Sequence, residues 1–263
     1  MNTSFFKDFR TADFLIAFFM LFLPKPGISQ KVESLEELVQ ELFIAQTVYA
    51  QHKNEVQFTI KPAFWKIQGS RIMNIPLQLE YGFTDRLQVE LGFPFGLSHS
   101  AIGESSSVMG NTEVGFLYNF LKGNKPFALS LAMEFGLPTE KRVKDIENAG
   151  VTCGPSLIVA TQIGRSQVHI SFGAEISRSV SSFNYNLAGV YPLQDWLATL
   201  ELNGEIDDQK IIYITPGLVW KGLDDFEFGV GIPKSITNNS VSMGVIVMIT
   251  HEFSLTRRDK HDQ

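Results

Sequence analysis

Glutamate recurs along the chain at positions that share one parity within predicted β-strands. These residues are Glu80, Glu90, Glu113, Glu134, Glu175, Glu201, Glu227 and Glu252. Because side chains of a strand alternate between its two faces, residues of one parity line one face. Few basic residues share that parity, Lys61 being the main one. Such an acidic face around a lumen would favour cations or polar solutes that carry positive groups.

A structural interpretation of the same glutamates stays open. Charged interiors are common in barrels with or without a specific substrate, and Arg86, Arg165 or Arg178 from turns and loops could balance the carboxylates.

Two pairs of glutamates are expected to face each other across short turns. Glu80 and Glu90 lie at nearly equal distances from Thr84-Asp85, and Glu113 and Glu134 at equal distances from the turn at 122–125. Like charges directly opposite are destabilising. They are tolerated if solvated, if one is protonated, or if a cation or a long basic side chain bridges them.

Other chemistries find little support in the sequence. A lipid-modifying enzyme would need a Ser-His site, and His99-Ser100 and His251 lack an orienting Asp or Asn at a recognisable spacing. There is no Cys/His metal spacing, and Gly229 and Gly231 lie within a strand, where glycine relieves crowding or allows curvature. We therefore expect no enzyme, no catalytic residue, no cofactor and no metal.

The elements that position these residues are β-strands. In residues 86–95, for example, Leu87, Val89 and Leu91 alternate with Gln88, Glu90 and Gly92. About twelve such segments lie near residues 55–66, 72–83, 86–96, 111–121, 126–137, 151–163, 167–178, 183–192, 196–205, 210–220, 226–234 and 241–253. Each is at least as long as the roughly nine residues that a tilted membrane strand needs.

The connections alternate in length. Tight turns at 84–85, 122–125, 164–166, 194–195 and 222–225 alternate with longer or more polar loops, of which 97–110 and 138–150 are the longest. This is typical of an antiparallel up-and-down β-barrel with both ends on its short-turn, periplasmic side. A soluble β-sandwich is the competing fold.

Aromatic residues favour the barrel over the sandwich. One predicted girdle, at the short turns, comprises Phe83, Phe120, Phe127, Tyr191, Trp196, Trp220, Phe226 and Phe253, and further phenylalanines lie toward the other strand ends. Two such girdles mark the two membrane interfaces. The strand face that alternates with the apolar one is rich in Gly, Ser, Thr, Gln, Asn and Glu, which suits a water-filled lumen.

The N-terminal part divides into an export signal and a helix. Lys7 and Arg10 precede an apolar run at 14–23, so residues 1–29 are predicted to be a cleavable signal peptide; ten apolar residues are too few for the alternative, an anchoring transmembrane helix. Residues 30–54 form a periplasmic segment with an amphipathic helix over 34–43, capped by Ser34 and Glu37. The helix would pack on the barrel end or be partly ordered, or else would dock a partner or plug the lumen. Residues 55–253 form the barrel and 254–263 a polar tail.

Charge and cysteine content exclude other classes. The mature chain keeps 19 basic and 26 acidic residues, a formal charge of −7, so a basic footprint for nucleic acid is absent. Cys153 is the only cysteine and cannot form an internal disulfide. The final strand carries Ser242, Gly244 and Phe253 in a pattern like the signal that barrel-assembly machinery recognises. Membrane lipid and that machinery are the expected partners, besides an unknown small solute.

Several motifs resemble a known family. They are Tyr81-Gly82-Phe83-Thr84-Asp85-Arg86-Leu87-Gln88-Val89-Glu90, Asn111-Thr112-Glu113-Val114-Gly115, Phe135-Gly136-Leu137-Pro138-Thr139 and Thr215-Pro216-Gly217. These resemble the outer-membrane transporters named after the MetA pathway of phenol degradation, over residues 55–253. The resemblance implies one barrel and a transport role, without catalytic residues to carry over. The sequence thus predicts a porin-like outer-membrane channel or transporter for small polar or hydrophobic solutes, with a negatively lined lumen. A plugged structural or anchoring barrel is the alternative, followed by a lipid-modifying enzyme.

Overall fold

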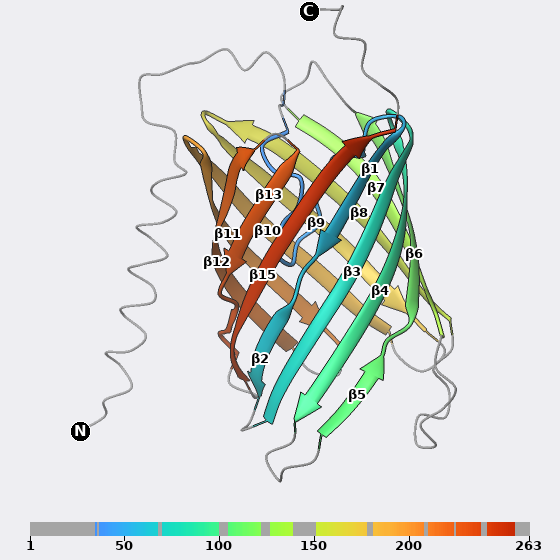
Figure 1. Cartoon of the computed structure of the whole chain (residues 1–263), viewed down its shortest axis with the longest axis vertical. Coiled ribbons are helices and arrows are strands. Elements are labelled where there is room, and N and C mark those ends of the chain that lie inside the picture. Colours follow the sequence, from blue (N-terminus) through green and yellow to red (C-terminus); the bar gives the residue numbers. More distant parts are fainter. Residues whose placement is uncertain are drawn as a thin grey trace, which may run out of the picture.

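The computed structural model is a closed antiparallel β-barrel (Figure 1). It describes Leu35 and residues 37–67, 70–99, 105–121, 127–138, 151–177, 181–207, 210–223, 225–237 and 241–255. The strands are β1 (Glu55–Ile60), β2 (Ala63–Ile67), β3 (Ser70–Thr84), β4 (Leu87–His99), β5 (Ser105–Met109), β6 (Thr112–Leu121), β7 (Phe127–Leu137), β8 (Thr152–Ile163), β9 (Ser166–Ile176), β10 (Ser181–Leu193), β11 (Trp196–Ile206), β12 (Lys210–Leu223), β13 (Phe226–Gly231), β14 (Lys234–Ser235) and β15 (Val241–Ser254).

Twelve strands close the barrel, as predicted. The pairs β1/β2, β5/β6 and β13/β14 are interrupted halves of single strands. Both halves of β1/β2 lie against β3, both halves of β5/β6 against β4, and both halves of β13/β14 against β12. Two of the interruptions fall at Pro62 and Pro233, which have no N–H for a ladder hydrogen bond. The barrel closes where β15 pairs with β1 and β2, which satisfies backbone N–H and C=O groups that lipid could not hydrogen-bond.

Tight turns lie at the end of the barrel where β1 begins and β15 finishes. Gly164, Gln194 and Asp225 take positive φ angles of 63°, 58° and 60° in these turns, the conformation that short hairpins require. The Leu255 N–H donates to the Asn54 carbonyl at 2.8 Å, which brings both ends of the barrel together there. The longer connections lie at the opposite end.

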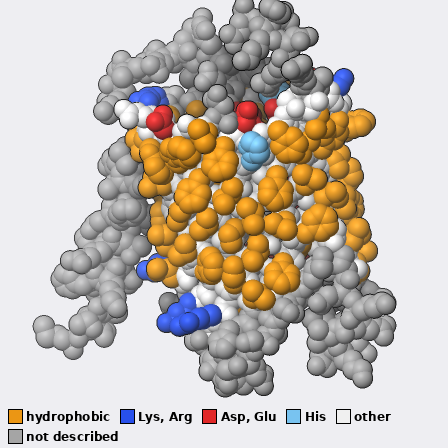
Figure 2. Space-filling view, in the orientation of Figure 1, with side chains coloured by type: hydrophobic (Ala, Val, Ile, Leu, Met, Phe, Trp, Pro, Cys, Tyr) orange, Lys and Arg blue, Asp and Glu red, His pale blue; other side chains and the backbone are white. Residues whose placement is uncertain are grey.

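The barrel carries apolar side chains on its outside and polar ones within. Figure 2 shows a broad apolar belt across the face of the barrel that is in view. Outward residues such as Phe58, Leu79 and Phe172 are exposed, whereas Gln57, Thr199 and Glu201 are fully buried. This inversion of the usual burial pattern is what a barrel in lipid needs. Among the described residues, no helix is long and apolar enough to cross a membrane.

The prediction of a helix over 34–43 is wrong for those of its residues that the structure describes. Residues 37–43 are irregular, with bends instead of helical turns, and they run inside the barrel rather than at its end (Figure 1). The apolar positions do face partners, but the backbone N–H groups bond to side chains of the barrel wall, which replace the intrahelical bonds. The predicted signal peptide at 1–29 and most of the polar tail lie outside the described residues.

Candidate functional site

The lumen is filled in its middle and short-turn half by residues 37–54, which we term the lumen segment. Its backbone is held first by Glu201 of β11. One carboxylate oxygen accepts the Phe43 N–H at 2.7 Å, and the other accepts those of Ile44 at 2.9 Å and Ala45 at 2.7 Å. Glu201 is 0% exposed. A buried carboxylate that receives three backbone donors is well compensated for its lost hydration.

Glu227 of β13 holds the segment's start in the same way. Its Oε1 accepts the Gln40 N–H at 3.0 Å and lies 3.0 Å from the Lys221 ammonium. Lys221 also donates to the Leu38 carbonyl at 2.8 Å. Both predicted lumen carboxylates therefore bind protein backbone.

The opposite wall binds the second half of the segment. The Val48 carbonyl accepts hydrogen bonds from Asn119 Nδ2 at 2.9 Å and Ser130 Oγ at 2.5 Å, and the Gln51 N–H donates to Gln88 at 2.9 Å. Burial raises the pKa of the Tyr49 phenol above its ordinary range, and the Glu37 carboxylate adds to the rise. Tyr49 thus stays protonated beside His169, whose ring lies edge-on at 6.0 Å.

Two apolar clusters complete the contact. Val39, Leu42, Phe43 and Ala45 pack on one patch of the wall, which is formed by Ala63, Ala188, Val190, Leu197, Val219, Ile246 and Met248. Val48 and Ala50 pack on a second patch, formed by Leu117, Ala128, Ala132, Ile158 and Ala160. An apolar patch inside a polar lumen is explained by the segment that covers it.

Phe43 fits into a socket made of glycines on β12 and β13. A Cβ on Gly217 would lie 2.2 Å from the phenylalanine ring, and one on Gly231 or Gly229 would lie 2.8 or 3.0 Å from it. The sequence predicted that Gly229 and Gly231 relieve crowding or allow curvature. The structure supplies the crowding group, which is an aromatic ring of the same chain.

The glutamates on strands β3 to β7 alternate with glycines. Glu80 pairs with Glu90 across β3 and β4, as the turn predicted. Glu113 does not face Glu134, so that prediction is wrong: Glu113 pairs with Gly136 and Gly115 with Glu134. The cause is the register next to the turn, where Leu121 pairs with Leu129. The hairpin is therefore centred later in the chain than the middle of 122–125, and the partner of Glu113 differs from the predicted one by two residues.

Glycine next to each carboxylate gives the glutamate side chain room. Gly115 lies opposite Glu90 and Gly92 opposite Glu113. A Cβ on Gly92 would lie 2.8 Å from a Glu113 carboxylate oxygen, and one on Gly115 3.1 Å from the Glu90 Cβ. The lumen carboxylates thus lie along the wall over these glycines, which leaves space in front of them.

Buried amides and one ammonium group balance the carboxylates nearest the lumen segment. Glu80 accepts hydrogen bonds from Gln78 at 2.7 Å, Gln57 at 3.1 Å and Gln51 at 3.3 Å. Lys61, the predicted basic lumen residue, forms an ion pair with Glu41 of the lumen segment at 2.6 Å. The Lys61 and Glu41 side chains are only 16% and 9% exposed, so the pair is poorly screened by solvent.

The long-loop half of the lumen remains hollow. A cavity of about 590 Å³ is lined by Gln46, Glu113, Glu134, Glu175, Asn184 and Glu205, among others. A second cavity of about 200 Å³ lies against Glu41, Lys61, Glu80 and Glu90, and it shares Glu113 and Glu134 with the first. Ile44 and Gln46 of the lumen segment border both cavities, so the segment stands where a passage would continue.

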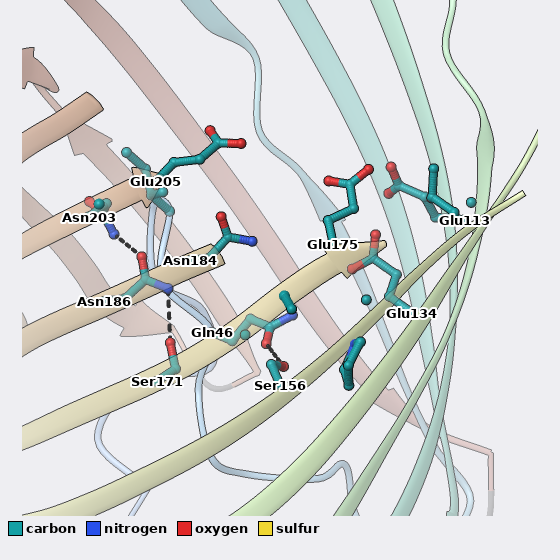
Figure 3. Close-up of a pocket in the computed structure, with 18 of the residues that line it drawn as sticks. Gln46, Glu113, Glu134, Ser156, Ser171, Glu175, Asn184, Asn186, Asn203 and Glu205 are labelled. Carbon is teal, nitrogen blue, oxygen red and sulfur yellow. Dashed lines mark hydrogen bonds between the residues drawn. The ribbon is translucent and has the colours of Figure 1, made fainter. Parts of the chain in front are cut away.

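Figure 3 shows the large cavity with three carboxylates on one side and asparagine amides, together with Glu205, on the other. Glu113, Glu134 and Glu175 gather on the first side. On the second, Asn203 donates to Asn186 and Asn186 to Ser171, each at 2.9 Å. Ser156 donates to Gln46 of the lumen segment at 2.9 Å. The surface can offer acceptors and donors to a polar solute.

Sequence reasoning missed Glu205 and this amide ladder. Glu205 shares the inward parity of Glu201 and is the last residue of the predicted segment 196–205, so its parity was the signal that could have found it. The asparagines gave a weaker signal, because polar residues of that parity were expected throughout a wet lumen.

The remaining predicted residues lie at the rims. Glu175 is exposed near the long-loop end, and Glu252 pairs with Gln57 near the short turns. Of the predicted girdle, Phe83, Phe120, Phe127, Trp196 and Phe253 are exposed, whereas Tyr191, Trp220 and Phe226 are half-buried. The Arg165 guanidinium lies 5.9 Å from the centre of the Tyr191 ring.

The candidate Ser-His residues are not brought together by any described contact. Ser100 lies outside the described residues, and His251 is exposed on β15 with its Nδ1 2.9 Å from the Asp225 carbonyl. Across the described ranges, no group of three His, Cys, Asp or Glu side chains could hold a metal ion.

Comparisons with known proteins agree with this fold. The model of a family described as a membrane-bound β-barrel domain (DUF5777) matches residues 40–195, so the chain belongs to that family. No curated protein matches the chain. The narrower resemblance to transporters of the MetA phenol pathway stays a prediction.

Solved structures share the architecture at low identity. The COG4313 outer membrane channel from Pseudomonas putida F1 is 12% identical, with a TM-score of 0.60 over 78% of this chain and 98% of that one. The NanC porin is 8% identical, with a TM-score of 0.56 over 75% and 100%. The KdgM porin is 13% identical, with a TM-score of 0.52 over 74% and 99%. These similarities concern the fold.

Proposed function

We propose that this protein is an outer-membrane channel for small polar solutes that its own lumen segment closes. The observation that carries the proposal is the lumen itself: a polar cavity of about 590 Å³ leads from the long-loop end to Ile44 and Gln46 of the segment. The channel opens when the segment leaves the lumen.

The way in which the segment is held supports a movable closure. It forms no β-strand with the wall. It is held by side-chain hydrogen bonds, by the glycine socket around Phe43 and by two apolar patches. Water or a solute can replace the segment in each of these contacts. A wall built only for a permanent core would not need carboxylates at the points of contact, because apolar packing stabilises a buried contact at lower desolvation cost.

The preferred solute is a cation or a neutral polar molecule that carries a positive group. Glu113, Glu134, Glu175 and Glu205 all line the cavity, and no described Lys or Arg side chain does so. Carboxylates around a narrow passage attract cations and exclude anions.

A structural barrel with a permanent plug is the second candidate. The observation that favours it is the depth of burial of Val39, Leu42 and Val48, each 0% exposed. Burial of such side chains contributes about 1.5–3 kcal/mol each, so a permanent plug is physically reasonable.

Planar bilayer recording separates the two candidates. In a Cys153→Ser background, Gln46→Cys and Ser156→Cys place thiols on two side chains now 2.9 Å apart, which a short reducible thiol cross-linker can join. We expect voltage-dependent openings in the uncross-linked protein, silence after cross-linking and openings again after reduction. The Gln46→Cys single variant treated alike is the control. Silence of the uncross-linked protein at every voltage, with large conductance only after deletion of residues 37–50, would favour the permanent plug.

A further inference from the structure

A row of basic residues crosses four neighbouring strands on the outer wall of the barrel. Lys66 of β2 pairs with Arg71 of β3, Met243 of β15 pairs with Lys66, and Lys234 of β14 pairs with Met243. Neighbouring strands are about 4.8 Å apart, so three cations lie within about 15 Å of each other along one line. We term these three cations and Met243 the basic row.

The basic row faces away from the lumen. Lys66, Arg71 and Lys234 are exposed, and they share the parity of exposed apolar residues on their own strands. Lys66 lies two residues from Phe64, and Lys234 lies between Ile232 and Ile236. All are at the long-loop end of their strands. Figure 2 shows basic side chains directly below the apolar belt, in the region where β2 and β3 meet.

No acidic partner lies beside the basic row within the described part of the wall. The outward positions of β2, β3, β4, β12, β13, β14 and β15 carry no Asp or Glu, because Glu80, Glu90, Glu227 and Glu252 of these strands have the inward parity. None of the three cations forms an ion pair with a described residue. The described long-loop ends of β7, β8, β9 and β10 carry no charged outward residue, so among the described outward residues at this end the basic charge lies on one side of the barrel.

We propose that the basic row binds the phosphate groups of a lipid in the leaflet on the long-loop side. The three cations supply the charge for an anion that bears two or more phosphates. The apolar side chains between and below them, Met243 (57% exposed) and Phe64 (46% exposed), contact the acyl chains. A soluble anion would have no use for these apolar neighbours, whereas a lipid joins both chemistries in one molecule.

This binding surface is separate from the channel. It lies on the outer wall, and its occupancy does not depend on conduction. Its expected effect is to fix the barrel in a leaflet of defined composition and to stabilise the junction of β14, β15, β2 and β3, where the strands close the barrel and two of them are interrupted.

Native mass spectrometry of the detergent-solubilised full chain tests the proposal. The probes are bisphosphorylated lipid A, the same lipid with both phosphates removed, and inorganic phosphate. We expect bound lipid A on the wild-type protein, a rise in its melting temperature, and at least tenfold weaker binding by the variant Lys66→Gln/Arg71→Gln/Lys234→Gln. The dephosphorylated lipid should bind the wild-type protein as weakly as lipid A binds this variant.

The matched control removes three exposed cations at the short-turn end, in Lys53→Gln/Arg86→Gln/Arg165→Gln, and should bind lipid A as the wild type does. Heat-modifiable migration on gels verifies that each variant is folded; if the triple variant fails this check, the three single Gln variants replace it. Equal binding by wild type and triple variant, equal loss in the control, or displacement of lipid A by inorganic phosphate at the same concentration would each overturn the proposal.

Discussion

The Glu201 carboxylate accepts the Phe43 N–H at 2.7 Å near the middle of the barrel. Phe43 in turn fills the glycine socket of β12 and β13. The wall therefore holds the lumen segment at Phe43 in two ways, by a hydrogen bond to its backbone and by apolar packing around its ring.

Replacing Glu201 by glutamine should loosen the lumen segment. Glutamine keeps one acceptor oxygen and turns an amide donor toward N–H groups that donate to the second oxygen in the native protein. Loss of hydrogen bonds to a charged group costs about 1.5–3 kcal/mol, so the open probability in bilayers should rise at least tenfold. Glu205→Gln is the control, because Glu205 lies on the same inward face of β11 but, among the described contacts, accepts no hydrogen bond from the lumen segment. It should leave the open probability unchanged, and an equal rise there would contradict the role of Glu201.

Filling the glycine socket should expel Phe43. A Cβ on Gly231 would lie 2.8 Å from the ring, so Gly231→Ala and Phe43→Ala should each expose the lumen segment to protease added at the short-turn side. Because both changes break the same contact, the double variant should be cleaved no faster than the faster single one. Ile44→Ala, which alters an exposed side chain of the same segment, is the control. Additive cleavage rates would show that the socket is not the shared cause.

Lys61→Met should destabilise the closed state more than its charge alone suggests. It leaves Glu41 without its cation in a poorly solvated place, and breaking one partner of a buried pair costs about 3–5 kcal/mol. Adding Glu41→Gln removes the unpaired charge and should restore most of the loss. Thermal unfolding in detergent, followed by gel migration, measures both. A double variant no more stable than Lys61→Met would rule out the ion pair as the origin.

Charge neutralisation in the large cavity should change ion selectivity. In the chain lacking residues 37–50, Glu113→Gln/Glu134→Gln/Glu175→Gln should shift the reversal potential in a salt gradient toward anion permeability. Asp195→Asn, in a tight turn outside the lumen, should produce no shift. An unchanged reversal potential in the triple variant would remove the selectivity hypothesis and leave the carboxylates a structural role.

The barrel was predictable because its two signals repeat. Alternation of apolar and polar residues occurs in all twelve segments, and the tight turns fix most of the register, as the pairing of Glu80 with Glu90 shows. The pairing of Glu113 was not predictable, since two strands that slide by two residues keep the same alternation of apolar and polar side chains.

The lumen segment was the part that local rules could not predict. Its apolar spacing and capping residues favour a helix in isolation. Its hydrogen-bond partners lie up to 187 residues away, on Glu227 and Glu201. Alternation predicted that Glu201 and Glu227 point inward, but a sequence pattern could not show that these two carboxylates accept hydrogen bonds from the chain's own backbone.

The lumen segment runs directly into β1, with Asn54 bonded to Gly82 at the barrel rim. A segment tethered in this way stays at an effective concentration in the millimolar range even when it has left the lumen. Closure of the channel would therefore be a fast unimolecular step that is independent of the amount of protein in the membrane. An opening would last only while a solute, a voltage or a partner competes for the places that Phe43 and its neighbours have vacated.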